Sequence, residues 1–206
     1  MARTTGSNGE RTEAALRRAA QSLIARHGYE AVSMRALAAE VGVQAAALYR
    51  YFPTKQDLLF SLMREHMEEL IAAWLRVRGE GTAAPAERLA AFVANHIGFH
   101  VARRHATHVS NMELRSLTHE NLSAILRLRT AYEKELRQIL RDGAERGVFV
   151  VDDIAMTAMA IIQMITGVIV WFRPDERLSV DEVARTYLTM TLRLVGAAPT
   201  RETADV

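Results

Sequence analysis

Hydrophobic residues recur along most of the chain at intervals of three and four positions, the spacing that places them on one face of an α-helix. In residues 10–27, for example, Leu16, Ala20 and Ile24 share such a face, and Gly28 follows where a helix commonly ends. Runs that alternate between apolar and polar residues, the signature of strands, are missing from the sequence. The pattern therefore predicts an all-α protein of about nine helices.

Two short helices are expected next, joined by a turn at Gly42, whose lack of a side chain permits the positive φ that such a turn needs. Ser33 is the expected N-cap of the first, which buries Leu37, while Leu48 and Phe52 lie on the buried face of the second. This is a helix-turn-helix, in which the second helix enters the major groove of DNA. Further helices are expected up to about residue 78 and at about 86–104, 107–117, 121–146, 152–172 and 180–195.

Four short motifs follow one another around this turn, namely Ser33-x-Arg35-x-Leu37-Ala38, Val41-Gly42-Val43-Gln44, Leu48-Tyr49-x-x-Phe52 and Thr54-Lys55-x-x-Leu58. They resemble the TetR family of bacterial transcriptional regulators. At the same spacing the family pattern runs Thr-x-Arg-x-Ile-Ala, then Ala-Gly-Val-Ser, then Leu-Tyr-x-x-Phe, then Ser-Lys-x-x-Leu.

The resemblance implies a division of the chain into two domains. A three-helix, helix-turn-helix DNA-binding domain is expected over residues 10–54, and a helical domain for ligand binding and dimerisation over residues 55–196. The polar or small residues of 1–9 and 197–206 are expected to form disordered tails. The implied function is that of a transcriptional repressor, which releases a palindromic operator in double-stranded DNA when a small-molecule effector binds.

The resemblance also assigns DNA contacts. Ser33, Tyr49 and Lys55 are expected to touch phosphates, and the two-pronged guanidinium of Arg35 suits the edge of a guanine. The remaining expected DNA-binding residues are Gln44, Ala45, Ala46 and Arg50. Gln44 stands where the family has Ser or Thr, and the alanines offer no hydrogen bonds to bases. Sequence-dependent DNA shape is therefore expected to contribute to recognition.

Residues 154–172 are apolar on nearly every side, so the predicted helix must be buried from several directions. A second copy of the chain is the simplest cover, and the resemblance implies a homodimer formed through the last two helices. On this helix Thr157, Gln163, Thr166 and Gly167 interrupt the run, which leaves fewer than the roughly 18 continuous apolar residues of a membrane span. No membrane partner is expected.

Several pieces of the C-terminal half resemble the acyl-CoA-responsive branch of the family. They are His105, Met112-Glu113-Leu114, Arg129-x-x-Tyr132-Glu133, Gly143-x-x-x-Gly147-x-Phe149 and Trp171-Phe172-Arg173-Pro174. An acyl-CoA from lipid catabolism is therefore one expected effector; an efflux-pump regulator that responds to drug-like or aromatic ligands is the alternative. The expected ligand-binding residues are Phe99, Arg103, Val109, Met112, Ile125, Arg129, Tyr132, Met164 and Trp171.

Two features of the sequence, Arg129 and the number of methionines, have competing interpretations. Arg129 suits the anionic end of a coenzyme A thioester, but it also suits an ion pair with Glu133, four residues further along the helix. The nine methionines suit an adaptable ligand pocket, but they also suit ordinary core packing.

Charge and composition add little to this picture. The net charge is +2, and residues 1–60 carry eight Arg or Lys against five Asp or Glu. The absence of cysteine and of an apolar N-terminal leader predicts a cytoplasmic protein. His96 and His100 share a helix face and raise the alternatives of a metal site or a helical hydrolase. No nucleophile elbow or phosphate loop accompanies them, so neither an enzyme, a metal nor a cofactor is expected.

Overall fold

The computed structural model describes residues 5–79, 83–173 and 177–197, and the regular structure in these ranges is helical throughout. This confirms the predicted all-α class. In chain order the elements are α1 (Thr5–His27), α2 (Met34–Val41), α3 (Ala45–Tyr49), α4 (Lys55–Val77), α5 (Pro85–Ala102), α6 (Arg104–Met112), the 3-10 turn η1 (Leu114–Ser116), α7 (His119–Glu145), α8 (Ile154–Thr166), α9 (Val168–Trp171) and α10 (Val180–Leu194).

The structure corrects three details of the prediction. The predicted disordered tail over residues 1–9 is wrong for 5–9, because α1 continues through these residues despite their low helix propensity. The helix expected over 107–117 ends at Met112 and gives way to a 3-10 turn. The helix expected over 152–172 is divided at Gly167 into α8 and α9. Residues 1–4 and 198–206, the rest of the predicted tails, lie outside the described residues.

The chain packs as two compact units, whose limits differ from the predicted domain boundary after residue 54. The first unit comprises the described residues up to Met67 together with Arg104–Leu126. The second comprises Glu68–Arg103 and the described residues from Arg127 onward. A segment from the middle of the sequence, including α6, thus belongs by its packing to the N-terminal unit.

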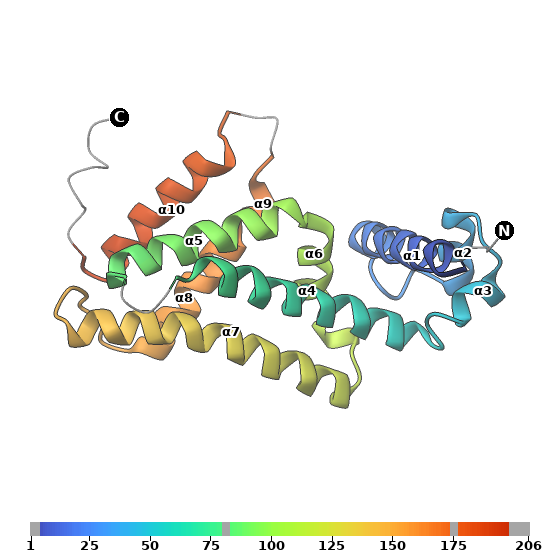
Figure 1. The fold of residues 1–206 in the computed structure, drawn as a ribbon, viewed down its shortest axis with the longest axis horizontal. Coiled ribbons are helices and arrows are strands. Elements are labelled where there is room, and N and C mark those ends of the chain that lie inside the picture. Colours follow the sequence, from blue (N-terminus) through green and yellow to red (C-terminus); the bar gives the residue numbers. More distant parts are fainter. Residues whose placement is uncertain (1–4, 80–82, 174–176, 198–206) are drawn as a thin grey trace. The chain divides into compact units, whose positions relative to one another are not determined.

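The core of the first unit is built from both of its segments. Within it, α1 packs against α2 and α6 (Figure 1). Leu16 and Leu37 from the N-terminal segment are fully buried, and Val109, Leu117 and Ile125 from the later segment join the same hydrophobic cluster. The core of the N-terminal helices is therefore completed partly by residues from a distant segment of the sequence.

The local signals of the helix-turn-helix are confirmed. The Ser33 hydroxyl accepts a hydrogen bond from the Ala36 N–H at 3.0 Å, as an N-cap does. Gly42 ends α2 with φ at 72°, the left-handed conformation that the turn requires. Gln44, at the start of α3, makes no side-chain cap.

In the second unit, α10 lies alongside α5, and both contact α8 (Figure 1). Fully buried apolar side chains fill the interior, among them Phe92 on α5, Leu136 on α7 and Ile161 on α8. The capping box expected at the start of α10 is confirmed, because Ser179 and Glu182 bond to each other's backbone N–H groups.

The stretch Ile154–Trp171 is, by length and composition alone, apolar enough to cross a membrane, even with its polar interruptions. Core helices of water-soluble proteins pass the same test. Only 28% of the stretch is buried within the single chain, so α8 and α9 leave a substantial apolar surface uncovered.

Gly143, on α7, is required by the close approach of Phe149. A Cβ atom at position 143 would overlap the Phe149 ring, whereas one at Gly98, in the middle of α5, would meet no atom within 4 Å. We expect Gly143→Ala to lower the free energy of unfolding by about 1–3 kcal/mol through overpacking. The matched change Gly98→Ala should raise it by about 0.5–1 kcal/mol by removing backbone freedom from the unfolded chain. Urea denaturation measures both, and equal effects of the two changes would contradict the packing argument.

Candidate nucleic-acid interface and effector site

The residues expected to bind DNA lie at the start of α2, along α3 and at the start of α4. Most are exposed, as a DNA contact requires: Ser33, Arg35, Gln44, Ala46, Tyr49 and Arg50 are exposed, and Ala45 and Lys55 are half-buried. The structure therefore brings the whole predicted set to the surface of the first unit. Their individual roles stay predictions.

The buried side of α3 explains why its other side faces solvent. Leu48 is fully buried and Phe52, just beyond the helix, is 3% exposed, while Tyr49 between them is 47% exposed. With Leu48 as its one buried residue, the five-residue helix leaves Ala46 and Tyr49 exposed, and Arg50 just beyond its end is exposed too. The small side chain of Ala46 permits a close approach of α3 to DNA, and Tyr49 and Arg50 can reach out from the end of the helix.

Lys55, the first residue of α4, is held against the turn that follows α1. Its ammonium lies 4.1 Å from the centroid of the Tyr29 ring and donates a hydrogen bond to the Glu30 carbonyl at 3.3 Å. Thr54 and Asp57 form a reciprocal cap at the start of α4, with both backbone-to-side-chain distances at 3.0 Å. The ammonium is thus placed at the N-terminal end of a long helix, a favourable site for a phosphate.

Arg17, on α1, contacts several other parts of the first unit. Its guanidinium bonds to Glu13 on its own helix and to Glu65 on α4 at 3.1 Å, and it also donates to the Ser61 hydroxyl. It lies 5.1 Å from the centroid of the Phe52 ring. One side chain therefore connects α1, α4 and the end of the helix-turn-helix.

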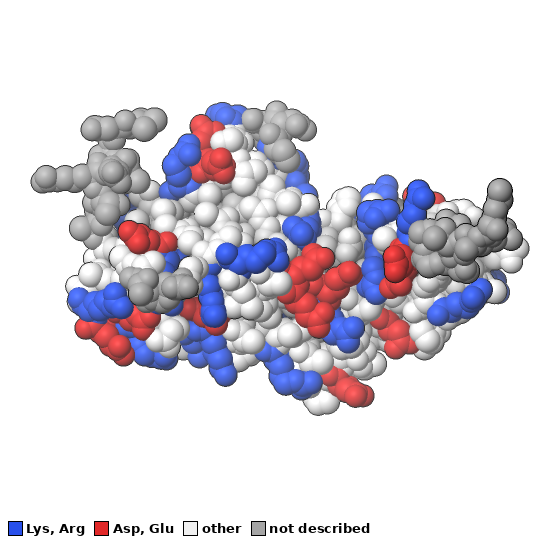
Figure 2. Space-filling model, viewed as in Figure 1, with Lys and Arg blue, Asp and Glu red and all other residues white. Residues whose placement is uncertain are grey.

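Charge alone would not identify this surface. On the face seen in Figure 2, Lys and Arg side chains are interspersed with Asp and Glu and are spread along the chain. The candidate interface is defined instead by the geometry of the helix-turn-helix and by which side chains it exposes.

A polar centre lies in the interior of the second unit. Nδ1 of His96, on α5, is 3.2 Å from the Tyr132 hydroxyl on α7, and its Nε2 is 2.8 Å from the Thr166 hydroxyl at the end of α8. His96 is 1% exposed and Tyr132 is 3% exposed. Nδ1 of His100 donates to the His96 carbonyl at 2.8 Å. Three helices thus meet around hydrogen-bonding groups in an otherwise apolar core.

Aromatic rings line one side of this centre. The Phe92 ring stacks on Tyr132 with centroids 5.0 Å apart and meets the Trp74 ring edge-on at 5.1 Å. The indole N–H of Trp74 donates to Glu135 at 2.9 Å. The His96 and His100 rings are stacked at 3.9 Å. Burial raises the pKa of Tyr132, so its hydroxyl keeps its proton and can act as a hydrogen-bond donor.

The predicted ligand-binding residues are divided between the two units. Phe99 and Tyr132 are buried in the second unit, and Arg129 and Met164 are half-buried there. Burial lowers the pKa of Arg129. Arg103 is exposed, with its guanidinium 4.2 Å from the centroid of the Phe99 ring and paired with Glu69 at 2.8 Å.

The other predicted contacts lie elsewhere. Val109 and Ile125 are part of the hydrophobic core of the first unit, and Met112 is exposed on its surface. Trp171 is 47% exposed and bonds through its indole N–H to the Tyr187 hydroxyl at 3.2 Å. The packing gives Val109 and Ile125 a structural role; whether any of these four contacts an effector stays a prediction.

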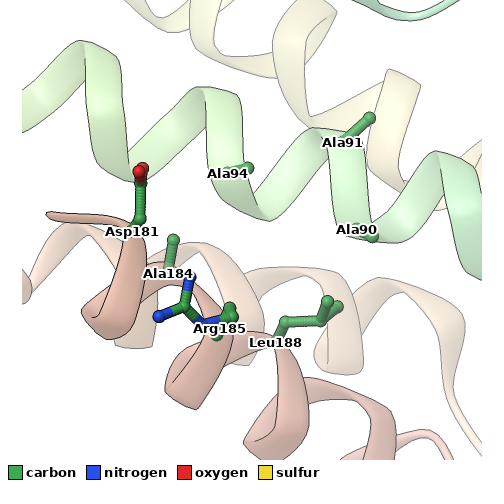
Figure 3. Close-up of a pocket in the computed structure, with 7 residues that line it drawn as sticks. All are labelled: Ala90, Ala91, Ala94, Asp181, Ala184, Arg185 and Leu188. Atoms are coloured by element: carbon green, nitrogen blue, oxygen red, sulfur yellow. The ribbon is translucent and has the colours of Figure 1, made fainter. Parts of the chain in front are cut away.

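A shallow groove of about 380 Å³ runs between α5 and α10, where α5 contributes only alanines (Figure 3). It is lined by Ala90, Ala91, Ala94, Asp181, Ala184, Arg185 and Leu188. None of the predicted ligand-binding residues is among them, so this groove does not coincide with the candidate effector site.

The metal-site alternative for the histidines receives no support from the geometry. Within residues 5–79, 83–173 and 177–197, no three His, Asp or Glu side chains are grouped so that they could hold a metal ion. The ion pair between Arg129 and Glu133 was the other expectation for this helix. In the structure Glu133 pairs with Arg137.

Sequence reasoning missed Thr166, which it treated only as an interruption of an apolar run. Its partner His96 lies 70 positions away, so no local pattern connects the two. The i, i+4 spacing of His96 and His100 was the one available signal for the polar centre, and it pointed to a metal as readily as to a hydrogen-bonded network.

An exposed recognition helix on one unit and a second helical unit with its own polar centre are the organisation of a ligand-controlled transcriptional regulator. Residues 16–62 match the family model described as bacterial regulatory proteins, tetR family. Residues 82–195, more than half of the chain, match the model described as tetracyclin repressor-like, C-terminal domain. The chain belongs to the TetR family of transcriptional regulators, as its resemblance implied.

Individual relatives agree with this assignment. The HTH-type transcriptional repressor KstR2 of Rhodococcus jostii (strain RHA1) is 27% identical over 191 residues, 92% of each chain. A tetR-family regulatory protein from Rhodococcus RHA1 has a TM-score of 0.86 and 31% identity, covering 91% of this chain and 98% of its own. AibR, solved with isovaleryl coenzyme A and operator DNA, has a TM-score of 0.79 and 28% identity, covering 91% and 100%. These relatives are regulators, which favours a non-enzymatic role over a helical hydrolase.

The buried His100 should make the fold sensitive to acid. Burial lowers its pKa to about 4, opposed by the bond to the His96 carbonyl and assisted by the charge of Arg129. Between the unfolded pKa of about 6.5 and the folded value, the unfolded chain binds the extra proton, so stability falls as pH falls through this window. We expect wild type to lose roughly 2 kcal/mol more than His100→Asn between about pH 7.5 and about pH 5 in urea denaturation.

The control for this comparison is His108→Asn, which removes an exposed imidazole. It should follow wild type at both pH values. If His100→Asn loses as much stability as wild type, the buried imidazole is not the source of the acid sensitivity.

Proposed function

We propose that this protein is a homodimeric repressor that binds a palindromic operator and releases it when an acyl-CoA thioester enters the second unit. The observation that carries the effector class is the polar centre at His96 and Tyr132, enclosed by apolar and aromatic side chains. Such a site suits a ligand that is apolar over most of its length and has one hydrogen-bonding carbonyl.

On the DNA side, Arg35 reads a guanine edge, and Ser33, Tyr49 and Lys55 contact phosphates. The exposure of these residues on α2, α3 and α4 supports the proposal. Gln44 and Arg50 add polar contacts at the two ends of α3, while Ala45 and Ala46 approach the bases without donors of their own. DNA shape supplies the remaining discrimination. Because operator DNA lies in the bacterial cytoplasm, the protein acts there.

On the effector side, the acyl chain lies among Phe99, Met164 and the rings that stack on Tyr132. The Tyr132 hydroxyl donates to the thioester carbonyl. The phosphates of coenzyme A are met by Arg103, which is exposed and must then exchange its partner Glu69 for the ligand. The AibR structure, which holds both isovaleryl coenzyme A and operator DNA, gives a family precedent for this pair of ligands.

Dimerisation involves the apolar surface of α8, α9 and α10. Large hydrophobic side chains stand exposed there in the single chain, namely Met156, Met159, Val170, Trp171, Met190 and Leu194. Exposed apolar area of this extent is unusual for a monomer and marks a contact surface. A second copy related by a two-fold axis covers it and supplies the second recognition helix for a palindromic site.

Operator binding should depend on Arg35 and not on exposed arginines in general. We expect Arg35→Ala to weaken binding to DNA from the region upstream of the protein's own gene by about 10- to 100-fold, the value of one bidentate base contact. Arg26→Ala, which removes an exposed arginine bonded to Ser22 on α1, should bind as wild type does. Fluorescence anisotropy at fixed salt measures both. Equal affinities of all three proteins would rule out the assigned role of Arg35.

Release should be specific to the thioester. Titration of the protein–operator complex with medium- and long-chain acyl-CoAs should abolish the anisotropy signal, whereas the free acids should not. Tyr132→Phe removes one hydrogen bond to the carbonyl and should raise the acyl-CoA concentration needed for half-release by about tenfold. Its operator affinity without effector should stay near that of wild type.

If the protein binds the operator tightly but no acyl-CoA releases it, the proposed repressor function stands and this effector class is excluded. The aromatic cluster of Phe92, Trp74 and Tyr132 would then direct the search to drug-like and aromatic ligands, the efflux-regulator alternative.

A further inference from the structure

The residues that follow α6 are hydrogen-bonded to the turn between α1 and α2, within the first unit. Oε1 of Glu113 accepts a hydrogen bond from the Tyr29 N–H at 3.0 Å, across 84 positions of sequence. Its other oxygen accepts from the Ser116 hydroxyl at 2.8 Å. Both carboxylate oxygens are thus hydrogen-bonded, one to the turn after α1 and the other to the end of η1.

Gln56, in the first turn of α4, forms a second connection to the same two segments. Its Nε2 donates to the Tyr29 hydroxyl at 3.2 Å and to the Ser116 carbonyl, and its Oε1 accepts from the Thr118 N–H at 3.3 Å. Both ends of the amide are therefore used, in an arrangement that neither Glu nor Leu could reproduce.

Tyr29 is where these bonds converge. It follows Gly28, which ends α1 with φ at 80°, and its side chain is 5% exposed. Glu113 satisfies the backbone N–H at this turn, and Gln56 fixes the far end of the ring at its hydroxyl. The face of the same ring lies 4.1 Å from the Lys55 ammonium, which also bonds to the neighbouring Glu30 carbonyl. The position of the ammonium thus depends on the turn and ring that Glu113 and Gln56 hold.

We propose that Glu113 and Gln56 are positioning residues for operator binding, which fix the Tyr29 turn so that Lys55 is preset to contact a DNA phosphate. The inference rests on the proposed contact between Lys55 and the operator backbone. Neither residue need touch DNA: each acts through Tyr29. A lysine side chain otherwise loses considerable conformational freedom when it binds, and presetting it reduces that cost.

The test measures the salt dependence of operator binding, which reports the number of phosphate contacts. Log K falls as log salt concentration rises, and each lost contact makes this negative slope shallower by about one; a lower slope below means a shallower one. Lys55→Ala should lower the slope by about one and weaken binding roughly tenfold at low salt. Glu113→Ala and Gln56→Ala should lower the slope in the same direction. Glu113→Gln keeps an acceptor for the Tyr29 N–H and should restore the wild-type slope.

The double variant separates positioning from a general loss of structure. If Glu113 acts through Lys55, Glu113→Ala should have little further effect on the slope or the affinity in the Lys55→Ala background, a strongly non-additive cycle. Thermal unfolding of each variant confirms that the proteins compared are folded. Should Glu113→Ala not fold, Tyr29→Phe gives the same comparison, since it removes only the hydroxyl bonded to Gln56.

The outcomes distinguish this inference from the function on which it rests. Salt-sensitive binding by wild type with unchanged slopes for Glu113→Ala and Gln56→Ala overturns the positioning role alone. Full additivity with Lys55→Ala overturns it as well. If wild type binds no DNA at low salt, the proposed repressor function fails, and the positioning role fails with it.

Discussion

The first unit depends on one constraint: its N-terminal helices are too short to bury their own apolar faces. The helix-turn-helix contributes eight residues in α2 and five in α3, which cannot enclose a core even with α1. The missing cover comes from the first half of α4, including Leu59 and Met63, and from Val109, Leu117 and Ile125 in the later segment. This arrangement packs the helix-turn-helix into one core with residues from α6 to the start of α7. It also explains why the compact unit does not end where the family motif ends, and why polar bonds such as that from Glu113 to Tyr29 can reach the turn beside the candidate interface.

The second unit contains a buried polar centre and an uncovered apolar surface. Inside, aromatic and aliphatic side chains surround a small hydrogen-bonded centre in which His96 is bonded through both ring nitrogens. Burying these groups is tolerable because they are paired with one another, and pairing also fixes the relative positions of α5, α7 and α8. Outside, the apolar residues of α8, α9 and α10 find no cover within the chain. The proposed effector site and the proposed dimer surface therefore share α8, which contributes Thr166 to the interior and exposed methionines to the outside.

Sequence periodicity predicted the class, the order of the helices and most of their limits, because hydrophobic spacing and caps such as Ser33 and Ser179 act over one or two turns. The family motif likewise placed the candidate DNA contacts on exposed positions. Neither the periodicity nor the family motif could predict contacts between residues that are far apart in the sequence. Val109 and Ile125 look like any apolar helix residues, and only the fold shows that they serve the first unit. Thr166 and Gln56 gave no local sign of their partners. Low helix propensity in residues 5–9 was overridden by continuation of α1, since propensity is a weak local preference.

The composition of α3 connects these features to recognition. The helix has no side-chain cap at Gln44 and carries alanines where base contacts are expected, so it is held in place by Leu48 and Phe52 more than by its own hydrogen bonds. In the proposed complex, polar contact with the operator therefore comes mainly from residues beside α3, above all Arg35 and Lys55. The accuracy of those contacts is set by the scaffold that holds the two side chains, and a recognition helix with so few donors leaves little to compensate if that scaffold shifts. A network of hydrogen bonds behind Lys55 is consequently more valuable here than it would be beneath a helix rich in polar side chains.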